Sequence, residues 1–268
     1  GQNCHLPART PSISPPRPMN DKSLSSLARM LSVLDLFNEQ QLCWTAEAIT
    51  EALQVSLPTG YRYVKMLTEA GLLQRGADSH YTLGPRIIVL DHYIRMSDPV
   101  LQHGVPFMRE VVAQTGLDCV ISALQGHQLL DAYREVGSTP ASLSYGRGRP
   151  RPLFQGAAPK VILASLPTAH LHKLFDAHTD EIARVGLPTE WPAFRRYYSA
   201  IRKAGHYFSN GELEVSLAAL AVPMQKADGT LLGSIQVVGT VQRMAVIDLN
   251  KLTELLQRAA QDITARIP

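Results

Sequence analysis

Apolar residues recur at helical spacing in two short segments near the start of the chain. Residues 23–39 (SLSSLARMLSVLDLFNE) and residues 44–53 (WTAEAITEAL) each place them three or four positions apart, which predicts two amphipathic helices. The predicted buried positions are Leu27, Leu31, Leu34, Ile49, Ala52 and Leu53. Thr45 suits the N-cap of the second helix because its hydroxyl can accept a hydrogen bond from a free backbone amide.

The stretch SLPTGYRYVKMLTEAGLL, residues 56–73, predicts a third helix with two unlike sides. Ser56 suits its N-cap, Pro58 its opening turn and Gly71 its end. One side is small or apolar and carries Gly60, Val64 and Leu67. The other side offers hydrogen-bond donors, aromatic surface and positive charge from Thr59, Tyr61, Arg62 and Lys65, with Tyr63 at its border. Such a face suits phosphates and base edges, and an ordinary solvated helix face is the alternative.

Residues 72–83 predict a hairpin, with strands at Leu72–Arg75 and His80–Leu83 and turn-forming residues between them. Because only the three residues QVS join the second helix to the third, the three helices and the hairpin predict a winged helix-turn-helix. The expected DNA contacts are Ser56, Thr59, Tyr61, Arg62, Lys65, Arg75 and His80. A small helical domain with a purely structural hairpin is the alternative.

The charge of this first segment limits how tightly one copy can hold DNA. Between residues 20 and 84 there are five Lys and Arg (Lys22, Arg29, Arg62, Lys65 and Arg75) against seven Asp and Glu (Asp21, Asp35, Glu39, Glu47, Glu51, Glu69 and Asp78). The whole chain is mildly basic, with a net charge of +3, which permits nucleic acid without demanding it. A dimer on two half-sites would therefore have to supply much of the affinity.

Residues 85–98 (PRIIVLDHYIRMSD) predict a linker helix between two domains, bounded by Gly-Pro and Asp-Pro. Ile87, Leu90 and Ile94 form an apolar stripe along it. Two arrangements would cover this stripe: pairing with a second copy, or packing on the chain's own second domain.

From residue 99 to 268, strand and helix signals come in groups. Strands are predicted at 118–124, 128–136, 142–145, 216–224 and 230–239. Helices are predicted at 105–116, 157–166, 168–178, 192–205 and 249–267. Strands that follow strands, with helices grouped before and after them, predict an antiparallel sheet covered by helices, so the expected fold class is α+β.

Composition excludes several classes of protein. A chain of 268 residues that is 45% apolar suits two domains. There is no run of about 18 apolar residues and no export leader, so a cytoplasmic protein without a membrane partner is expected. The first twenty residues contain five prolines, and residues 1–22 are expected to form a disordered tail.

Neither a metal site nor a cofactor is expected. Cys4, Cys43 and Cys119 are odd in number and far apart, which supports neither a disulfide framework nor a zinc site. The histidines of residues 170–178 stand at spacings of two and six, which do not share one helix face. No nucleophile elbow, Walker loop or dinucleotide-binding glycine motif occurs, so catalysis is disfavoured.

Three stretches together carry a family resemblance: TGYRYVKMLTEAGLL followed by YTLG, PLFQGAAPKVILA, and AGHYFSNGELEVSLAALAVPMQKADGTLLGSIQVVG. From about residue 23 to 267 the chain resembles the IclR family of bacterial transcriptional regulators. The resemblance implies a winged helix-turn-helix at 23–84, a linker helix at 85–98 and a GAF-like effector-binding domain at 99–268. It also implies double-stranded operator DNA, a small effector and a homodimer or tetramer.

The resemblance further implies where the effector binds, namely at the loop and helix start within 143–160 and at two late strands. Matched position by position, the implied contacts are Leu143, Arg151, Ala157, Ala158, Ser209, Ala219, Gln236 and Val238. Arg151 can pair bidentately with a carboxylate, and a solvated arginine loop is the alternative. We hypothesise a small organic acid with an apolar or aromatic body, held by Arg151 and flanked by Tyr133 or Tyr145. Glu212 and Glu214 fit acidic positions of the family and are expected to sit on the rim or to repel anions rather than to bind them.

These observations predict a ligand-responsive, DNA-binding transcriptional regulator. Two rival interpretations remain at this point. One is a small-molecule enzyme with an accessory winged helix, and the other is a protein-interaction module in which the winged helix binds a partner protein.

Overall fold

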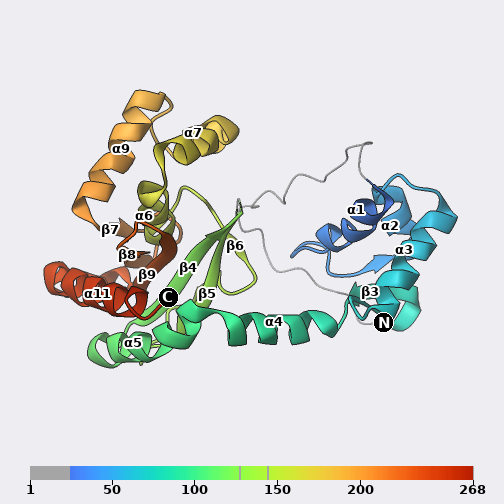
Figure 1. Ribbon diagram of the computed structural model, residues 1–268, viewed down its shortest axis with the longest axis horizontal. Helices are drawn as coiled ribbons and strands as arrows, with labels where there is room; N and C mark the ends of the chain where they lie inside the picture. Colours follow the sequence, from blue (N-terminus) through green and yellow to red (C-terminus); the bar gives the residue numbers. More distant parts are fainter. Residues whose placement is uncertain (1–24, 127, 144, 268) are drawn as a thin grey trace. The chain divides into compact units, whose positions relative to one another are not determined.

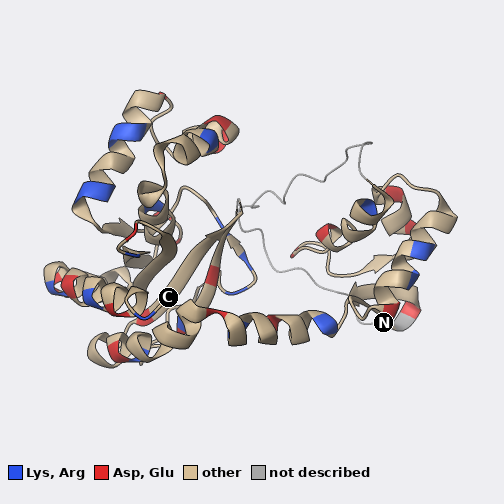
Figure 2. Cartoon of the chain, in the orientation of Figure 1, with Lys and Arg blue, Asp and Glu red and all other residues tan. Residues whose placement is uncertain are grey.

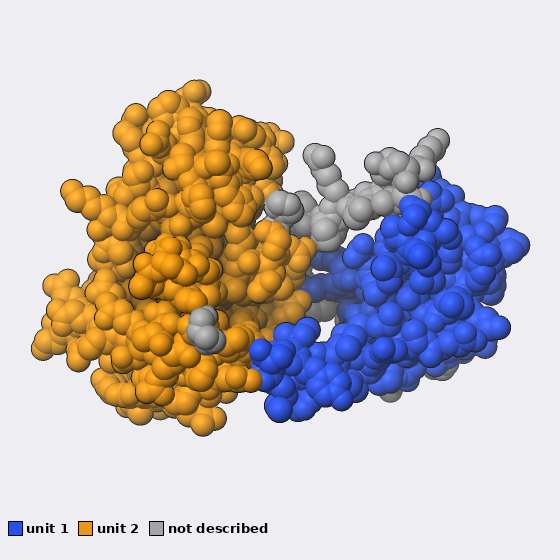
Figure 3. Space-filling model, viewed as in Figure 1, with its two compact units in different colours: residues 1–97 blue, residues 98–268 orange. Residues whose placement is uncertain are grey.

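The computed structural model describes residues 25–126, 128–143 and 145–267, which form two compact units. The first unit ends at Ser97 and the second begins at Asp98 (Figure 3). The predicted tail at residues 1–22 lies outside the described residues.

The first unit holds short helices and a small antiparallel sheet of strand order β1-β3-β2 (Figure 1). The helical elements are α1 (Ser26–Leu31), η1 (Leu34–Leu36), α2 (Ala46–Ala52), α3 (Leu57–Glu69), η2 (Ala77–Ser79) and α4 (Arg86–Ser97). The strands are β1 (Trp44–Thr45), β2 (Leu73–Arg75) and β3 (His80–Leu83). The predicted hairpin is thus present, and β1 adds a third strand through the pairs Trp44↔Tyr81 and Thr45↔His80. This is a winged helix-turn-helix.

The first helix is shorter than predicted and buries a different side. Instead of one helix over 23–39, α1 ends at Leu31 and a 3₁₀ turn follows. Leu27 and Leu31, predicted as core, are exposed, while Val33 is fully buried. The indole N–H of Trp44 donates to the carbonyl of Leu36 at 3.1 Å, so a contact eight residues along the chain holds this turn.

Helices α2 and α3 cross closely because of one glycine. A Cβ on Gly60 would stand 2.0 Å from the hydroxyl oxygen of Thr50 on α2, closer than any real contact permits. Thr45 caps α2 as predicted, accepting from the amide of Ala48 at 3.2 Å. Ala52, in contrast, is exposed although it was predicted to be buried, and Ala46 is buried on this helix instead.

Tyr63 belongs to the core side of α3 rather than to the border of its polar face. Its side chain is buried with Val64 and Leu67, and its hydroxyl lies 2.9 Å from that of Ser26. Gly71, with a φ of 73°, follows the last turn of α3 as predicted.

The linker helix α4 has no buried residue. Of the predicted apolar stripe, Ile87 is half-buried, while Leu90 and Ile94 are exposed at 41% and 58%. The first unit by itself therefore leaves Leu90 and Ile94 uncovered.

The second unit is one antiparallel sheet between two layers of helices (Figure 1). The strand order is β6-β5-β4-β9-β8-β7. The strands are β4 (Asp118–Gln125), β5 (Gln128–Glu135), β6 (Pro150–Arg151), β7 (Tyr207–Asn210), β8 (Leu217–Gln225) and β9 (Leu231–Thr240). The helices are α5 (Pro99–Thr115), α6 (Ala157–Ser165), α7 (Thr168–Ala177), α8 (Thr179–Arg184), α9 (Trp191–Ala204), α10 (Val241–Met244) and α11 (Leu249–Thr264). Because helices cover both sheet faces, this unit is the α+β domain that was predicted.

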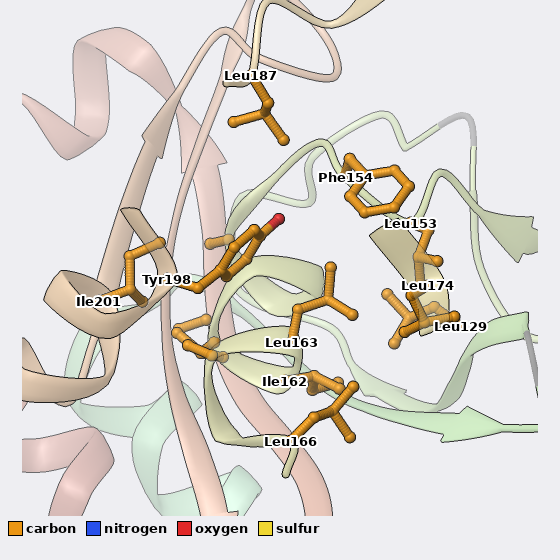
Figure 4. Close-up of a cluster of buried hydrophobic side chains, with 14 of the residues drawn as sticks. Leu129, Leu153, Phe154, Ile162, Leu163, Leu166, Leu174, Leu187, Tyr198 and Ile201 are labelled. Atoms are coloured by element: carbon orange, nitrogen blue, oxygen red, sulfur yellow. The ribbon is translucent and has the colours of Figure 1, made fainter. Parts of the chain in front are cut away.

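Each sheet face has its own hydrophobic cluster. On the face we call the α6 side, residues of α6, α7 and α9 pack on alternate strand residues, and Figure 4 shows Ile162, Leu163, Leu174 and Tyr198 among them. On the face we call the α11 side, α5 and α11 cover residues such as Cys119, Leu220 and Val237. The period-two alternation of β4, β8 and β9 thus divides one run of apolar residues between two cores.

Two predictions for this unit need correction. The stretch 142–145 is not a strand in its described residues, and the edge strand instead forms at Pro150–Arg151. Helix α5 begins at Pro99 rather than at Val105, because Asp98 caps it by accepting from the amide of Val100 at 2.8 Å.

Among the described residues no helix is long and apolar enough to cross a membrane. The same residues contain no group of three or more His, Cys, Asp and Glu placed to hold a metal ion.

Candidate functional site

The polar side of α3 is an exposed surface next to the wing. Tyr61, Arg62 and Lys65 are exposed there, together with Arg75 on β2 and His80 on β3. In Figure 2 the basic positions of α3 lie on a unit that carries both signs of charge. Of the seven residues predicted to contact DNA, Tyr61, Arg62 and Lys65 thus form a basic and aromatic surface on α3 that the first unit leaves exposed.

The start of α3 differs in detail from the expectation. Ser56 stands at the N-cap position, but its side chain caps no amide. Its hydroxyl lies 2.9 Å from that of Thr59, so the two hydroxyls hold each other at the opening turn. Both groups keep further hydrogen-bonding capacity, since a hydroxyl can donate once and accept twice.

Tyr61 is held in place by the preceding helix. Its hydroxyl donates to a carboxylate oxygen of Glu47 in the first turn of α2. This hydrogen bond lowers the pKa of Glu47 below its usual value and raises that of Tyr61. The ring of Tyr61 is still about half exposed, at 47%. Lys65 pairs loosely with Glu69 at 3.8 Å, and both side chains are exposed, so this pair restrains Lys65 weakly.

A cavity lies on the α6 side of the sheet of the second unit. Its lining comprises Tyr145, Arg151, Gly156, Ala157, Ser209, Leu213, Glu214, Leu217, Ala218, Ala219 and Val238. Six of these were predicted as effector contacts: Tyr145, Arg151, Ala157, Ser209, Ala219 and Val238. The sheet register explains three of them, because Ser209 pairs with Ala219 and Ala219 with Val238, which forms one row across β7, β8 and β9.

The cavity is small. Its volume of about 20 Å³ corresponds to roughly one water molecule. An organic acid would need a wall of this cavity to move.

Four predicted contacts do not line the cavity. Leu143 packs against the cluster of the α6 side, Ala158 is buried in α6, and Gln236 lies one row along β9 from Val238. Tyr133 was predicted to flank the effector, and this prediction is wrong, because Tyr133 packs on the α11 side of the sheet. The β4–β5 register shifts between Ile121 and Ser122, and this bulge turns Tyr133 away from the cavity.

Arg151 is buried and already paired. Its guanidinium lies 3.1 Å from a carboxylate oxygen of Asp131, and only 1% and 2% of the two side chains are exposed. Its Cζ stands 4.0 Å from the ring centroid of Tyr145, whose pKa burial raises. Ser122 donates to the same oxygen of Asp131 at 2.7 Å. Arg151 is therefore a fixed, charge-balanced wall of the cavity and not a solvated loop residue.

A second charged cluster adjoins the cavity at the start of α6. The ammonium of Lys160 lies 2.7 Å from Glu212, and it donates to the hydroxyl of Tyr207 at 3.0 Å. Tyr207 in turn donates to Glu212 at 2.7 Å. Burial, together with the hydrogen bonds that Tyr207 makes with Tyr197 and with the accepting carboxylate of Glu212, raises the pKa of Tyr207, so its hydroxyl stays protonated and donates.

Glu212 is not the rim residue that was expected. Besides Lys160 and Tyr207, it accepts from the backbone amide of Gly156 at 3.2 Å, directly before α6. Sequence reasoning missed Asp131, Lys160 and Tyr207 altogether, because each meets a charged partner far along the chain: Asp131 pairs with Arg151, Lys160 pairs with Glu212, and Tyr207 accepts from Lys160. The one signal available was a charged residue inside an otherwise apolar run, at Asp131 and at Lys160.

Two family models match the chain, one on each unit. The IclR helix-turn-helix domain matches residues 26–77. The C-terminal domain of the bacterial transcriptional regulator IclR matches residues 93–265.

Curated relatives match over nearly the whole chain. The HTH-type transcriptional regulator XynR of Escherichia coli K12 is 24% identical and covers 88% of this chain and 94% of its own length. The p-hydroxybenzoate hydroxylase transcriptional activator of Acinetobacter baylyi is 23% identical, with 90% of each chain covered.

Solved structures share the fold. An IclR homolog from Microbacterium hydrocarbonoxydans, complexed with 4-hydroxybenzoate, superposes with a TM-score of 0.70 at 24% identity, covering 90% of this chain and 98% of its own. An IclR family transcriptional regulator from Brucella abortus gives a TM-score of 0.74 at 17% identity, covering 92% of this chain and 94% of its own.

Proposed function

Because the chain belongs to the IclR family of bacterial transcriptional regulators, we propose that α3 lies in the major groove of operator DNA while the second unit binds a small organic acid. The chain is a DNA-binding regulator with an N-terminal helix-turn-helix and a C-terminal effector-binding domain, and the families and relatives that it matches are regulators rather than enzymes. The observation that carries this conclusion is the match of both family models, one to each compact unit. A regulator of this kind meets its operator in the cytoplasm, which is where we place this one.

The proposed DNA contact rests on the open face of α3. Arg62 and Lys65 stand one turn apart on that face, where each can neutralise a phosphate or reach a base edge. Arg75 and His80 on the wing would add contacts to the backbone. With so few cations in the unit, two copies on two half-sites would supply the affinity that one copy lacks.

We predict that Arg62→Ala and Lys65→Ala each weaken operator binding, and that together they abolish the shift of a DNA fragment from the promoter beside the protein's own gene. Removing a cation that neutralises one phosphate also reduces the salt dependence of binding by about one unit of slope. Electrophoretic mobility shift at several salt concentrations measures both effects. Lys251→Ala on the exposed start of α11 is the control, because it removes the same charge from the second unit. Unchanged binding in the double variant would place the DNA contact elsewhere.

The proposed effector is a small organic acid, and an aromatic body suits the apolar remainder of the cavity. Ala157, Ala219 and Val238 offer apolar surface, and Tyr145 offers a ring, beside the cation of Arg151. One similar structure, an IclR homolog, is complexed with the aromatic acid 4-hydroxybenzoate, and one relative is named as the p-hydroxybenzoate hydroxylase transcriptional activator.

We predict that benzoate or 4-hydroxybenzoate raises the unfolding temperature of the protein, and that benzamide does not. At a ligand concentration of about 100 times Kd the native state gains about 2.7 kcal/mol, which corresponds to a shift of several degrees for a protein of this size. Differential scanning fluorimetry followed by calorimetric titration makes the measurement. Aliphatic acids of similar size test whether the ring matters, and a lack of binding by every carboxylate would reject an acid effector.

A further inference from the structure

The carboxylate of Glu212 already occupies a site built to hold an acid. One of its oxygens contacts the ammonium of Lys160 at 2.7 Å and the amide of Gly156 at 3.2 Å, and the other accepts from Tyr207 at 2.7 Å. Only 7% of the Lys160 side chain is exposed, and its ammonium also lies 4.6 Å from the ring centroid of Tyr207. A buried cation, a phenol and an amide at a helix start together satisfy a single carboxylate group.

This acid site borders the cavity assigned to the effector. Gly156 and Ala157 line that cavity, and so do Leu213 and Glu214, the two residues that follow Glu212. A Cβ on Gly156 would stand 3.4 Å from Nη2 of Arg151, which places the second cation close to the same point of the chain. The segment 211–216 therefore forms a cavity wall and also supplies the carboxylate.

Arg151 lines the cavity and Lys160 adjoins it, and of these two cations Lys160 is the one whose partner can leave. The partner of Arg151 is Asp131 in the middle of β5, which is fixed by Ser122 and 2% exposed. The partner of Lys160 is Glu212 in a segment between strands, and 25% of its side chain is exposed. A ligand that replaces Asp131 would have to break the sheet, whereas one that replaces Glu212 moves a surface segment.

Charge balance leads to the same choice. With both ion pairs formed, two cations face two carboxylates, and the carboxylate of Glu214 lies in the lining of the cavity beside them. A further acid would enter beside like charges while both of these cations are already paired, which opposes its binding. If the Glu212 side chain rotates into solvent, the entering acid can take over its contacts with Lys160, Tyr207 and the amide of Gly156.

Polar atoms without partners are a second sign that this face of the sheet takes a polar ligand. Within the described residues, Nε of Arg151 and both amide atoms of Gln236 are buried and make no hydrogen bond. Gln236 lies on β9 one row from Val238 and faces the α6 side. Unsatisfied buried groups are rare in native proteins and call for a partner.

We infer that Glu212 is an internal carboxylate that competes with the effector, and that an organic acid binds by taking its place on Lys160, Tyr207 and the amide of Gly156. This inference rests on the proposed acid-sensing function and adds to it the anchoring residue and the ion pair that must break before an acid can bind. Exchange releases the segment 211–216 from α6, which opens the cavity wall, so binding and opening are one event.

The acid site is tested first without any effector, by chemical rescue in the full-length protein. Glu212→Ala is expected to lower the unfolding temperature. Acetate is expected to raise the unfolding temperature of this variant by more than it raises that of the wild type or of Glu254→Ala, an exposed control on α11. Acetamide and chloride at equal ionic strength should not restore it. If Glu212→Ala does not fold, Glu212→Ser, whose short side chain also vacates the carboxylate position, takes its place. Equal effects of acetate on all variants would overturn the inference.

Calorimetric titration with 4-hydroxybenzoate and benzoate then tests the exchange. Glu212→Gln is expected to bind both acids about tenfold more tightly than the wild type, because the internal competitor is gone. The double variant Glu212→Gln with Lys160→Met is expected to lose that gain. Equal affinity of the wild type and Glu212→Gln overturns the exchange while acid sensing stands. Absence of aromatic-acid binding in every variant, together with acetate rescue, rejects the aromatic effector and keeps the acid site.

Discussion

At the scale of single residues, Gly60 decides how the helix-turn-helix closes. Its missing side chain admits Thr50, whose hydroxyl donates to the carbonyl of Ala46 at 2.6 Å and leaves no room for a methyl group. Thr50 sits on a helix of only seven residues, and Gly60 lies in the first turn of α3. The angle at which α3 presents its polar face therefore depends on this one contact.

We predict that Gly60→Ala destabilises the first unit by about 1–3 kcal/mol and weakens operator binding more than its effect on folding explains. Chemical denaturation monitored by the fluorescence of Trp44, compared with mobility shift under conditions where the variant is folded, separates the two effects. Gly76→Ala is the control, since the nearest atom to a Cβ there is 3.7 Å away. A variant that keeps both the stability and the DNA affinity of the wild type would show that the helices can part without cost.

At the scale of elements, sequence patterns sufficed wherever the cause was local. Thr45 and Asp248 cap their helices through amides two or three residues away, and Gly71 and Gly116 end theirs with positive φ. The strands β4, β5, β8 and β9 were long enough for alternation to predict them. These elements need only their own residues to be recognised.

Elements that depend on distant partners were missed or misplaced. The edge strands β6 and β7 have two and four residues, too few for a pattern, and they exist because longer strands pair with them. Because of the bulge between β4 and β5, Tyr133 lies on the other sheet face, and the neighbouring sequence contains no residue that would predict a bulge. For the candidate site, the family resemblance predicted five cavity residues and the hypothesis of an aromatic acid predicted a sixth, Tyr145. The pairs Arg151–Asp131 and Lys160–Glu212 emerged only from the fold.

At the scale of the whole molecule, the exposed apolar side of α4 is the feature that one chain does not explain. Leu90, Tyr93, Ile94 and Met96 together line a surface hollow on this helix. Leu27 and Leu31 on α1 add exposed apolar surface to the same unit. Contiguous apolar surface of this kind marks an interface, and we propose a second copy as the partner.

We predict that Ile94→Glu shifts the protein from dimer toward monomer and weakens operator binding, because two half-sites are then no longer held together. Sedimentation velocity of the full-length protein measures the mass. Val246→Glu in the second unit is the matched control, since Val246 is also a β-branched apolar residue and is 84% exposed. A wild-type protein that sediments as a monomer, or an Ile94→Glu variant that keeps the wild-type mass, would contradict the proposal.

The division of β8 and β9 between two cores has a mechanical consequence. Ala219 and Val238 border the cavity, while their neighbours Leu220 and Val237 pack under the opposite helical layer of α5 and α11. A single strand layer thus separates the cavity proposed for the effector from α5, and close-packed interiors transmit strain instead of absorbing it. Helix α5 starts two residues after the end of the linker helix α4. A ligand that enlarges the cavity would therefore strain the helix that directly follows the linker.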